Sequence, residues 1–188
     1  MCPGPTWRPP SAHWNARAGS RRPGVSCDRH PKIGDSVLIG AGASLRYFAG
    51  VPWGASERLV AMLLPVAGDP ILICPRFELG TLEADLAVEA DIRLWEEDES
   101  PSALLADALR ERQVATLAID SAMAFLFVDR LCKAAPSIEV IDGSAIVDGC
   151  RMLKSSTELA LLAQAKAMTL EVQRRTARIL HEGITASE

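Results

Sequence analysis

The sequence has few of the residues that catalysis and metal binding most often use. Its 188 residues include only three histidines, and two of them, His13 and His30, fall within the first 34 residues. The third, His181, stands near the end of a predicted helix, where the helix dipole stabilises a cation. No HExxH or GxSxG motif is present, and a serine or cysteine nucleophile has no histidine base in the rest of the chain. We therefore assign no catalytic residue and no metal ligand.

Paired cysteines and long apolar runs are also missing. The five cysteines are odd in number and widely spaced, without a CxxC pair, which excludes a secreted disulfide framework and a zinc site. They are Cys2, Cys27, Cys74, Cys132 and Cys150. The longest apolar run, from Leu59 to Ala67, is interrupted by Pro65 and is far shorter than the roughly 18 residues of a membrane span. The N-terminus lacks the apolar core of a signal peptide, so we expect a cytoplasmic protein without a membrane segment.

Charge is divided unevenly along the chain. Residues 1–34 contain six Lys or Arg and one Asp, a balance of +5, whereas residues 35–188 contain 14 basic and 23 acidic residues, a balance of −9. An acidic body repels phosphate groups, so its field opposes binding to nucleic acid or to an anionic membrane. We expect neither as a partner of the folded part.

The first 34 residues differ from the rest in composition. They hold six of the twelve prolines and four of the thirteen glycines, together with Trp7 and Trp14, and show no helix or strand periodicity. This composition predicts a disordered basic head. One interpretation is a nucleic-acid arm in which arginine and tryptophan grip backbone and bases. The favoured interpretation is a start foreign to the fold, because the composition changes abruptly at 33–35.

From Ser36 onward, apolar segments alternate with helical ones, which is typical of an α/β domain with a mixed or mostly parallel sheet. Two of the expected strands flank Gly68 and form a predicted hairpin. The expected strands are 37–39, 58–65, 70–74, 90–95, 114–119 and 138–141.

Helices are expected between these strands, so that the sheet is covered on both faces. The spacing of apolar residues predicts helices over 77–88 and 121–135, the second stopped by Pro136. Ser100 followed by Pro101 indicates a helix start with a serine cap and proline in the first turn, and this helix should run to about Arg112.

The last segment predicts one long helix. Ser155 and Glu158 form a capping box, and the pattern continues to His181, with Gly183 as the stop. At 1.5 Å per residue this helix is about 40 Å long, too long to lie wholly on the small domain before it. Its apolar seam therefore needs another partner. The seam consists of Leu161, Ala165, Met168, Val172 and Ile179.

One segment, RYFAGVPWGASER, predicts a contact surface. It places aromatic residues and arginines in a loop after the first strand, a combination that ligand and partner contacts often use. The alternative is that Tyr47 and Phe48 belong to the core and that Arg58 pairs with a surface acid. The candidates are Arg46, Tyr47, Phe48, Trp53, Glu57 and Arg58.

Two weaker signals have simpler interpretations. Gly40 and Gly42 follow the first strand, but Leu45 replaces the third glycine of a dinucleotide-binding loop and Asp120 lies too far along the chain, so these glycines indicate a turn. The acidic run 96–99 is typical of a solvated loop.

The segments LRYFAGVPWGASERL, PILICPRFE, WEEDESP, LAIDSAMAF and DGSAIVDGCRMLKSSTELALLAQAKAMT occur in this order. Together they resemble the N-terminal region of the Xaa-Pro peptidase, prolidase and creatinase family. The likeness covers roughly 35–188 and is most specific at Arg151, Lys154, Ser155 and Glu158, before the long helix.

This resemblance implies a ribonuclease H-like α/β domain with a mixed sheet over 35–150. Residues 151–188 would then be the linker and the first helix of a truncated pita-bread catalytic domain. In such peptidases the catalytic domain holds two divalent metal ions (Mn, Co or Zn), whereas creatinase-type members work without metal. Members are usually homodimers, in which the N-terminal domain of one subunit leans over the active site of the other.

We accordingly expect an accessory and dimerisation domain, inactive by itself, that shapes the partner subunit's cleft for a proline-containing peptide. Arg46, Tyr47, Trp53 and Arg58 are the expected contacts, with Trp53 as an apolar wall and Arg58 as a site for a substrate carboxylate. The alternative is a stand-alone α/β module that binds a small molecule or a protein without catalysis.

Overall fold

A six-stranded mixed sheet forms the centre of the first of two units. The computed structural model describes residues 34–54 and 56–185, and the chain divides into the units Met1–Asp148 and Gly149–Glu188. The predicted head, 1–34, lies outside the described residues except for Gly34. The strands are β1 (Ser36–Gly40), β2 (Ala61–Pro65), β3 (Ile71–Pro75), β4 (Asp91–Trp95), β5 (Thr116–Ile119) and β6 (Glu139–Asp142).

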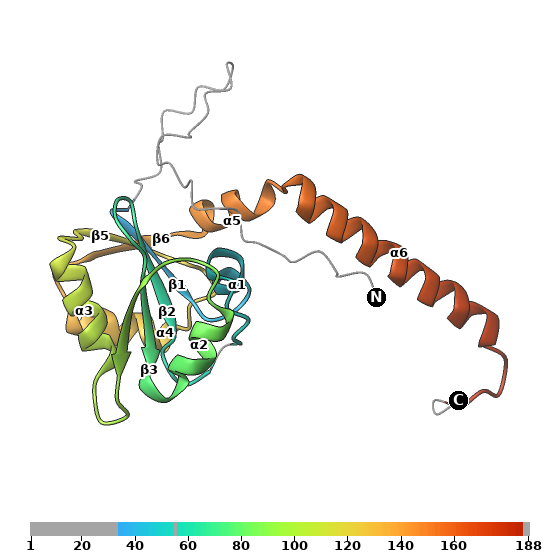
Figure 1. The fold of residues 1–188 in the computed structure, drawn as a ribbon, viewed down its shortest axis with the longest axis horizontal. Helices are drawn as coiled ribbons and strands as arrows, with labels where there is room; N and C mark the ends of the chain where they lie inside the picture. The colour runs from blue at the N-terminus through green and yellow to red at the C-terminus, as the bar shows by residue number, and fades with distance from the viewer. Residues whose placement is uncertain (1–33, 55, 186–188) are drawn as a thin grey trace, which may run out of the picture. The chain divides into compact units, whose positions relative to one another are not determined.

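The strand order β4-β3-β2-β1-β5-β6 places β1 next to the middle of the sheet (Figure 1). β2 runs antiparallel to both β1 and β3, and the remaining neighbours are parallel. Leu63 faces Ile71 across β2 and β3, which confirms the hairpin around Gly68. All five residues of β1 are buried, as expected for a strand covered on both faces.

Helices cover both faces of the sheet, which confirms the prediction. Along β1, Leu38 faces one apolar cluster while Val37 and Ile39 face the other, because successive side chains of a strand point to opposite faces. Leu105 and Leu109 close the first cluster, and Leu45 and Leu82 pack in the second. The first face carries α3 (Pro101–Glu111) and α4 (Phe125–Ala134); the second carries α1 (Ala43–Ala49), α2 (Leu79–Asp85) and α5 (Ser144–Met152).

The start of α3 follows the predicted signals closely. The Ser100 hydroxyl accepts a hydrogen bond from the Ala103 backbone N–H at 3.3 Å, and Pro101 occupies the first turn. The helix ends at Glu111, one residue before the predicted end. In the segment 77–88, a short 3-10 turn, η1 (Arg76–Glu78), precedes α2, which ends at Asp85.

One helix prediction after β5 needs correction, and one helix after β6 was not predicted. The helix predicted over 121–135 begins only at Phe125. The backbone carbonyl of Asp120 accepts from Met123 N–H at 2.9 Å, and its carboxylate accepts from Ala122 N–H at 3.2 Å, so the chain turns before the helix starts. The helix α5, for which no prediction was made, begins at Ser144, whose backbone N–H donates to the Asp142 carboxylate at 2.8 Å.

The second unit consists mainly of α6 (Ser156–Ile179), the predicted long helix. Its capping box is complete: Ser155 N–H donates to the Glu158 carboxylate at 2.7 Å, and Glu158 N–H donates to the Ser155 hydroxyl at 3.2 Å. The helix ends two residues before the predicted His181, whose ring nitrogen Nδ1 lies 3.0 Å from the Glu182 carbonyl oxygen. No residue of α6 is buried within the described chain.

The structure thus confirms a mixed α/β sheet flanked by helices and followed by one long helix. Within residues 34–54 and 56–185, no helix has both the length and the apolar character needed to cross a membrane.

Candidate functional site

The predicted contact segment is partly helical, which corrects the expectation of a loop from Arg46 to Arg58. Arg46 and Tyr47 lie on α1, because Leu45 and Ala49 are one helical turn apart and both are buried against the sheet. The helix begins after Gly42, whose φ of 133° is one that residues with a side chain rarely adopt. Gly42 therefore shapes a turn, as predicted, whereas Gly40 is the last residue of β1.

Gly50 ends α1 and turns the chain toward Trp53. Its φ is 84°, and a Cβ at this position would lie 2.7 Å from the Ala87 Cβ, so a larger residue fits neither the backbone nor the space. Tyr47 and Phe48 are half-buried and meet edge to face, with ring centroids 5.0 Å apart. Phe48 and Trp53 both pack against the apolar cluster beneath α1.

Trp53 and Arg58 line one pocket, beside the start of β2 and the end of β3. Its volume is about 230 Å³. Val60 and Pro75 supply apolar wall, and Glu78 adds a carboxylate from η1. The complete lining is Trp53, Gly54, Ser56, Arg58, Val60, Pro75 and Glu78. The structure therefore brings two of the four predicted site residues to one place, while Arg46 and Tyr47 stand on α1.

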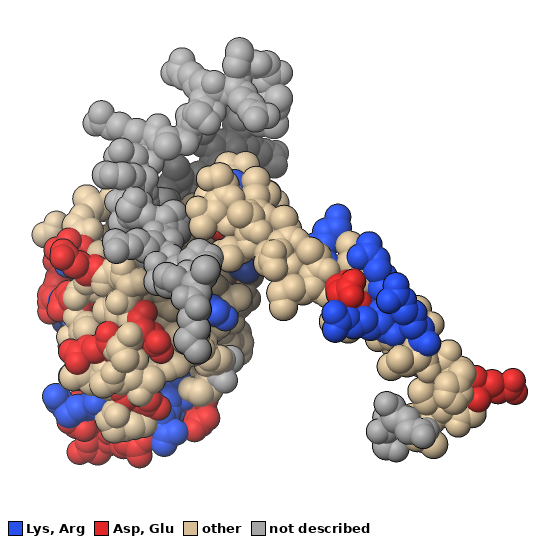
Figure 2. Space-filling model, turned by 45° about the vertical axis from the view of Figure 1, so that its right-hand side comes forward, with Lys and Arg blue, Asp and Glu red and all other residues tan. Residues whose placement is uncertain are grey.

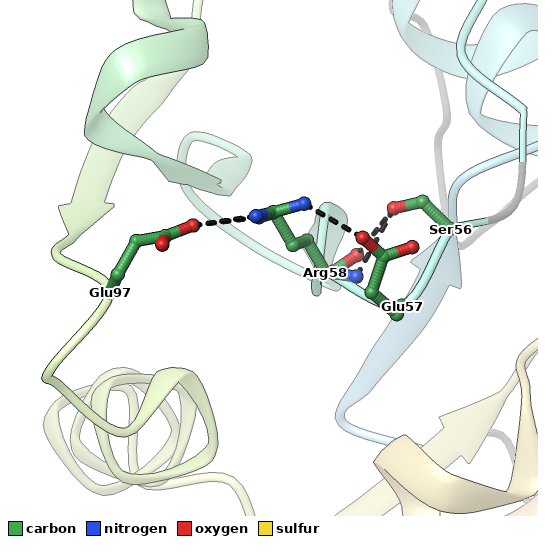
Figure 3. Close-up of polar contacts among 4 residues, drawn as sticks. All are labelled: Ser56, Glu57, Arg58 and Glu97. Atoms are coloured by element: carbon green, nitrogen blue, oxygen red, sulfur yellow. Dashed lines mark hydrogen bonds and ion pairs between the residues drawn. The ribbon is translucent and has the colours of Figure 1, made fainter.

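Two carboxylates hold the Arg58 guanidinium (Figure 3). Nε and Nη2 both reach Oε1 of Glu97, at 2.9 and 2.8 Å, and Nη1 lies 2.7 Å from Oε1 of Glu57. The guanidinium carbon also lies 5.3 Å from the centre of the Phe77 ring. The hydrogen bond to Glu97 and its negative charge raise the pKa of Arg58, so this group stays fully charged.

The backbone beside Arg58 is fixed by neighbours from distant parts of the sequence. The buried Trp95 indole N–H donates to the Leu59 carbonyl at 3.1 Å, and Ala41 N–H donates to the Val60 carbonyl at 3.1 Å. Ser56 and Arg58 exchange hydrogen bonds at 3.1 and 3.2 Å through the serine hydroxyl. These hydrogen bonds fix the position of the backbone from which the Arg58 side chain extends along the pocket.

The acidic run 96–99 is exposed, as predicted, but it also pairs with arginines. Glu97 binds Arg58, and Glu96 binds Arg76. This agrees with the alternative in which Arg58 pairs with a surface acid. Sequence reasoning missed Glu97 and Glu78 as neighbours of the pocket, because Glu97 is 39 positions from Arg58 in the chain.

Two further groups near the sheet bear on chemistry. Burial, reinforced by the negative charge of Glu78, raises the pKa of the Cys74 thiol to about 12, so this cysteine stays protonated and is a poor nucleophile. Asp120, at the end of β5, is buried, and its Oδ2 has no hydrogen-bond partner among the described residues. Its other oxygen serves the turn before α4.

The residues of the described chain do not fit a metal centre. In 34–54 and 56–185, no three His, Cys, Asp or Glu side chains come together in a group able to hold an ion. What the site offers is an aromatic wall and a charged arginine beside a small pocket, which is suited to recognition. The fold and the pocket thus define a mixed α/β domain in which Trp53 and Arg58 share one small pocket.

Comparison with known proteins identifies the family of this domain. The chain belongs to the creatinase/prolidase N-terminal domain family, whose model matches residues 33–153. Probable dipeptidases PepE of Mycobacterium bovis and Mycobacterium tuberculosis are 32% identical over 154 residues, covering 81% of this chain and 40% of theirs. The chain therefore spans about two fifths of the length of these curated relatives.

Solved structures share the fold. Dipeptidase PepE from Mycobacterium ulcerans matches with a TM-score of 0.73 and 31% identity, covering 82% of this chain and 42% of that one. A prolidase from Thermococcus sibiricus matches with a TM-score of 0.71 and 24% identity, covering 80% and 41%. The N-terminal domain of a Lactobacillus brevis Xaa-Pro dipeptidase matches with a TM-score of 0.55 and 16% identity, covering 62% and 89%.

Proposed function

We propose that this chain is the N-terminal accessory domain of a cytoplasmic Xaa-Pro peptidase-type hydrolase. The family match supports this role, and it ends at residue 153, immediately before the capping box that starts α6. Residues 151–188 then form the linker and the first helix of the catalytic part. The observation that carries the functional side of the proposal is that Trp53 and Arg58 line the same pocket.

In this role the pocket contributes to the substrate cleft of a partner subunit in a homodimer. Trp53 supplies an apolar wall against which a proline ring packs, and Arg58 supplies the charge for a substrate carboxylate. Glu97 already binds two nitrogens of Arg58, so an incoming carboxylate takes the place of Glu97 on the guanidinium. Arg46 and Tyr47, on the neighbouring α1, contact the cleft from the side.

The hydrolytic chemistry lies outside these residues. The divalent ions of such peptidases (Mn, Co or Zn) would be held by the catalytic part, and they supply Lewis acidity and an activated water there. The domain acts on binding, through shape and charge, so its substitutions should change KM more than kcat. We expect the 188-residue chain alone to leave Xaa-Pro dipeptides uncleaved when Mn²⁺ is present, as measured by proline release.

A chimeric enzyme tests the cleft role. Residues 34–153 replace the corresponding domain of the Mycobacterium ulcerans dipeptidase, which shares the fold. In this chimera, Trp53→Ala and Arg58→Gln should each raise KM for an Xaa-Pro dipeptide several-fold with little change in kcat. Arg76→Gln is the matched control, because Arg76 is also paired with a glutamate but does not line the pocket.

Equal kinetics of all three variants on every dipeptide tested would refute the cleft role. The stand-alone binding module makes a different prediction: Trp53 and Arg58 would then matter for ligand binding to the 188-residue chain itself. Titration of this chain with a dipeptide, followed by NMR shifts of the pocket residues, separates the two. Tight binding here, together with an unresponsive chimera, favours the module.

A further inference from the structure

The pocket beside β2 contains one carboxylate that the fold does not use. Glu78 lines this pocket from the end of η1, and no hydrogen bond or ion pair joins its carboxylate to another described residue. It directly precedes α2, yet its side chain does not cap the helix. A carboxylate that neither caps a helix nor pairs with an arginine of the described chain is available to a ligand.

The other charged or hydroxyl side chains of the pocket lining are already engaged. The Ser56 hydroxyl donates to the Arg58 carbonyl and accepts from the Arg58 backbone N–H. Glu97 holds the Nε and Nη2 edge of the Arg58 guanidinium, and Glu57 holds Nη1, as Figure 3 shows. Among the described residues of the lining, Glu78 is therefore the one charged side chain without a partner.

The charges near the pocket are negative in sum. Three carboxylates, those of Glu57, Glu78 and Glu97, neighbour the single guanidinium of Arg58. After the larger effects of Glu97 and Glu57, the charge of Glu78 also raises the pKa of Arg58, so this carboxylate acts on the guanidinium through space. Such a site attracts a cation and repels an anion that brings no positive charge of its own.

The first unit as a whole adds to this negative field. Residues 35–148 contain 19 acidic and 8 basic residues, and Figure 2 shows acidic side chains spread over the visible face of this unit. Salt screens distant charges, so the field favours the approach of cations, while contact with Glu78 determines which cations bind.

The apolar part of the lining suits the carbon chain of a cationic side chain. Val60 and Pro75 supply aliphatic surface, and Trp53 supplies an aromatic ring of the kind that attracts ammonium and guanidinium groups. The pocket, at about 230 Å³, is smaller than the roughly 300–1,000 Å³ of a typical ligand site. It therefore suits one part of a ligand.

The carboxylate proposed for Arg58 strengthens the need for a cation. This carboxylate displaces Glu97 from the guanidinium, which leaves both Glu97 and Glu78 without a positive partner. A ligand that brings a cation together with its carboxylate compensates these charges, whereas a ligand with a carboxylate alone does not.

We propose that Glu78 is a specificity-determining residue that binds a cationic group of the residue before proline in a peptide ligand. The cation is an ammonium or guanidinium group, which comes from the amino terminus or from a lysine or arginine side chain. This inference rests on the proposed function, in which Trp53 packs against the proline ring and Arg58 binds the carboxylate. It names the class of peptide that the pocket favours.

Three peptides separate the two sources of the cation in the 188-residue chain. Nα-acetyl-Leu-Pro carries no cation, Leu-Pro carries one at its amino terminus, and Nα-acetyl-Lys-Pro carries one on its side chain. NMR titration at pH 7 and low salt measures the dissociation constant of each peptide. The peptide whose cation binds Glu78 should have a dissociation constant about fivefold lower than that of Nα-acetyl-Leu-Pro.

Substitutions at Glu78 should change this preference. Glu78→Gln should abolish it without weakening the binding of Nα-acetyl-Leu-Pro. Glu78→Lys should reverse it, so that Nα-acetyl-Glu-Pro binds more tightly than Nα-acetyl-Lys-Pro. Glu83→Gln is the matched control and should keep the preference, because Glu83 is exposed on α2 and does not line the pocket. Circular dichroism checks that the variants keep the fold.

The peptide that loses affinity in Glu78→Gln identifies the source of the cation, and either source supports the proposal. Equal dissociation constants for all three peptides in the wild-type chain overturn it, as do equal losses in Glu78→Gln and Glu83→Gln. Where binding to the chain is too weak to titrate, the chimera decides: KM values for Lys-Pro and Leu-Pro that Glu78→Gln leaves unchanged overturn the proposal. The cleft role fails separately, since Trp53→Ala and Arg58→Gln test it without Glu78.

Discussion

The two units of this chain differ in what holds their helices. In the first unit, α3 buries Leu105 and Leu109 against the sheet, whereas α6 in the second unit has no buried residue within the described chain. Both helices begin with a serine cap that accepts from a backbone N–H. The comparison teaches that local signals specify where a helix begins, and that burial, which α6 lacks, supplies most of the stability of a helix.

The largest difference should appear when the same side chain is truncated in each unit. Leu63 on β2 is fully buried, and Leu63→Ala should lower the free energy of unfolding by about 2–5 kcal/mol through lost burial and the cavity left behind. Leu162 on α6 is 52% exposed, and Leu162→Ala should change it by less than about 0.5 kcal/mol. Urea denaturation followed by Trp fluorescence measures both; equal losses would contradict the comparison.

A smaller effect should come from removing the serine caps. Ser100→Ala should lower the free energy of unfolding by about 1 kcal/mol, because α3 unfolds together with the sheet. Ser155→Ala should leave the free energy of global unfolding unchanged and reduce only the helix content of α6. NMR should detect this as faster amide hydrogen exchange in the first turn of α6. Loss of global stability in the Ser155 variant would show that α6 is coupled to the sheet.

The smallest effect is on the pH dependence of stability. Hydrogen bonds from Thr116 and Ala115 backbone N–H, each 2.8 Å from the same carboxylate oxygen, lower the pKa of Asp35. Because the pKa of Asp35 in the folded chain lies below the ordinary 3.8, the ionised carboxylate stabilises the fold above that pH. This stabilisation is lost as the pH falls through the pKa of the folded state.

Because Asp35 is exposed, we expect Asp35→Asn to remove about 0.5 kcal/mol or less at neutral pH and to flatten the fall in stability below pH 3.8. Glu158 offers the comparison in the second unit, since the Ser155 backbone N–H lowers its pKa as well. Acid should reduce the helix content of α6 in the wild-type chain, and Glu158→Gln should remove this dependence on pH without changing global unfolding. Urea denaturation at pH 7 and pH 3 measures the free energy of unfolding, and circular dichroism measures the helix content of both variants. If stability depends on pH in Asp35→Asn as it does in the wild-type chain, the prediction for Asp35 is contradicted.

The candidate site shows where sequence reasoning stopped. Trp53 and Arg58 were identified because aromatic residues and arginines stood together after a strand, and both do line one pocket. Their partners were not identified: Glu97 comes from the turn after β4, and Glu78 comes from η1. The segment also contained α1, whose seven residues were too short for a clear helical period.

By itself the sequence determined the features that depend on near neighbours. The capping box at Ser155 and Glu158, the serine cap of α3 and the hairpin around Gly68 each rest on contacts within a few residues, which a local pattern records. Only the tertiary structure decided which carboxylate binds Arg58 and which strands neighbour β1. Those contacts join positions tens of residues apart, and chain folding, rather than local spacing, selects them among many chemically equivalent partners.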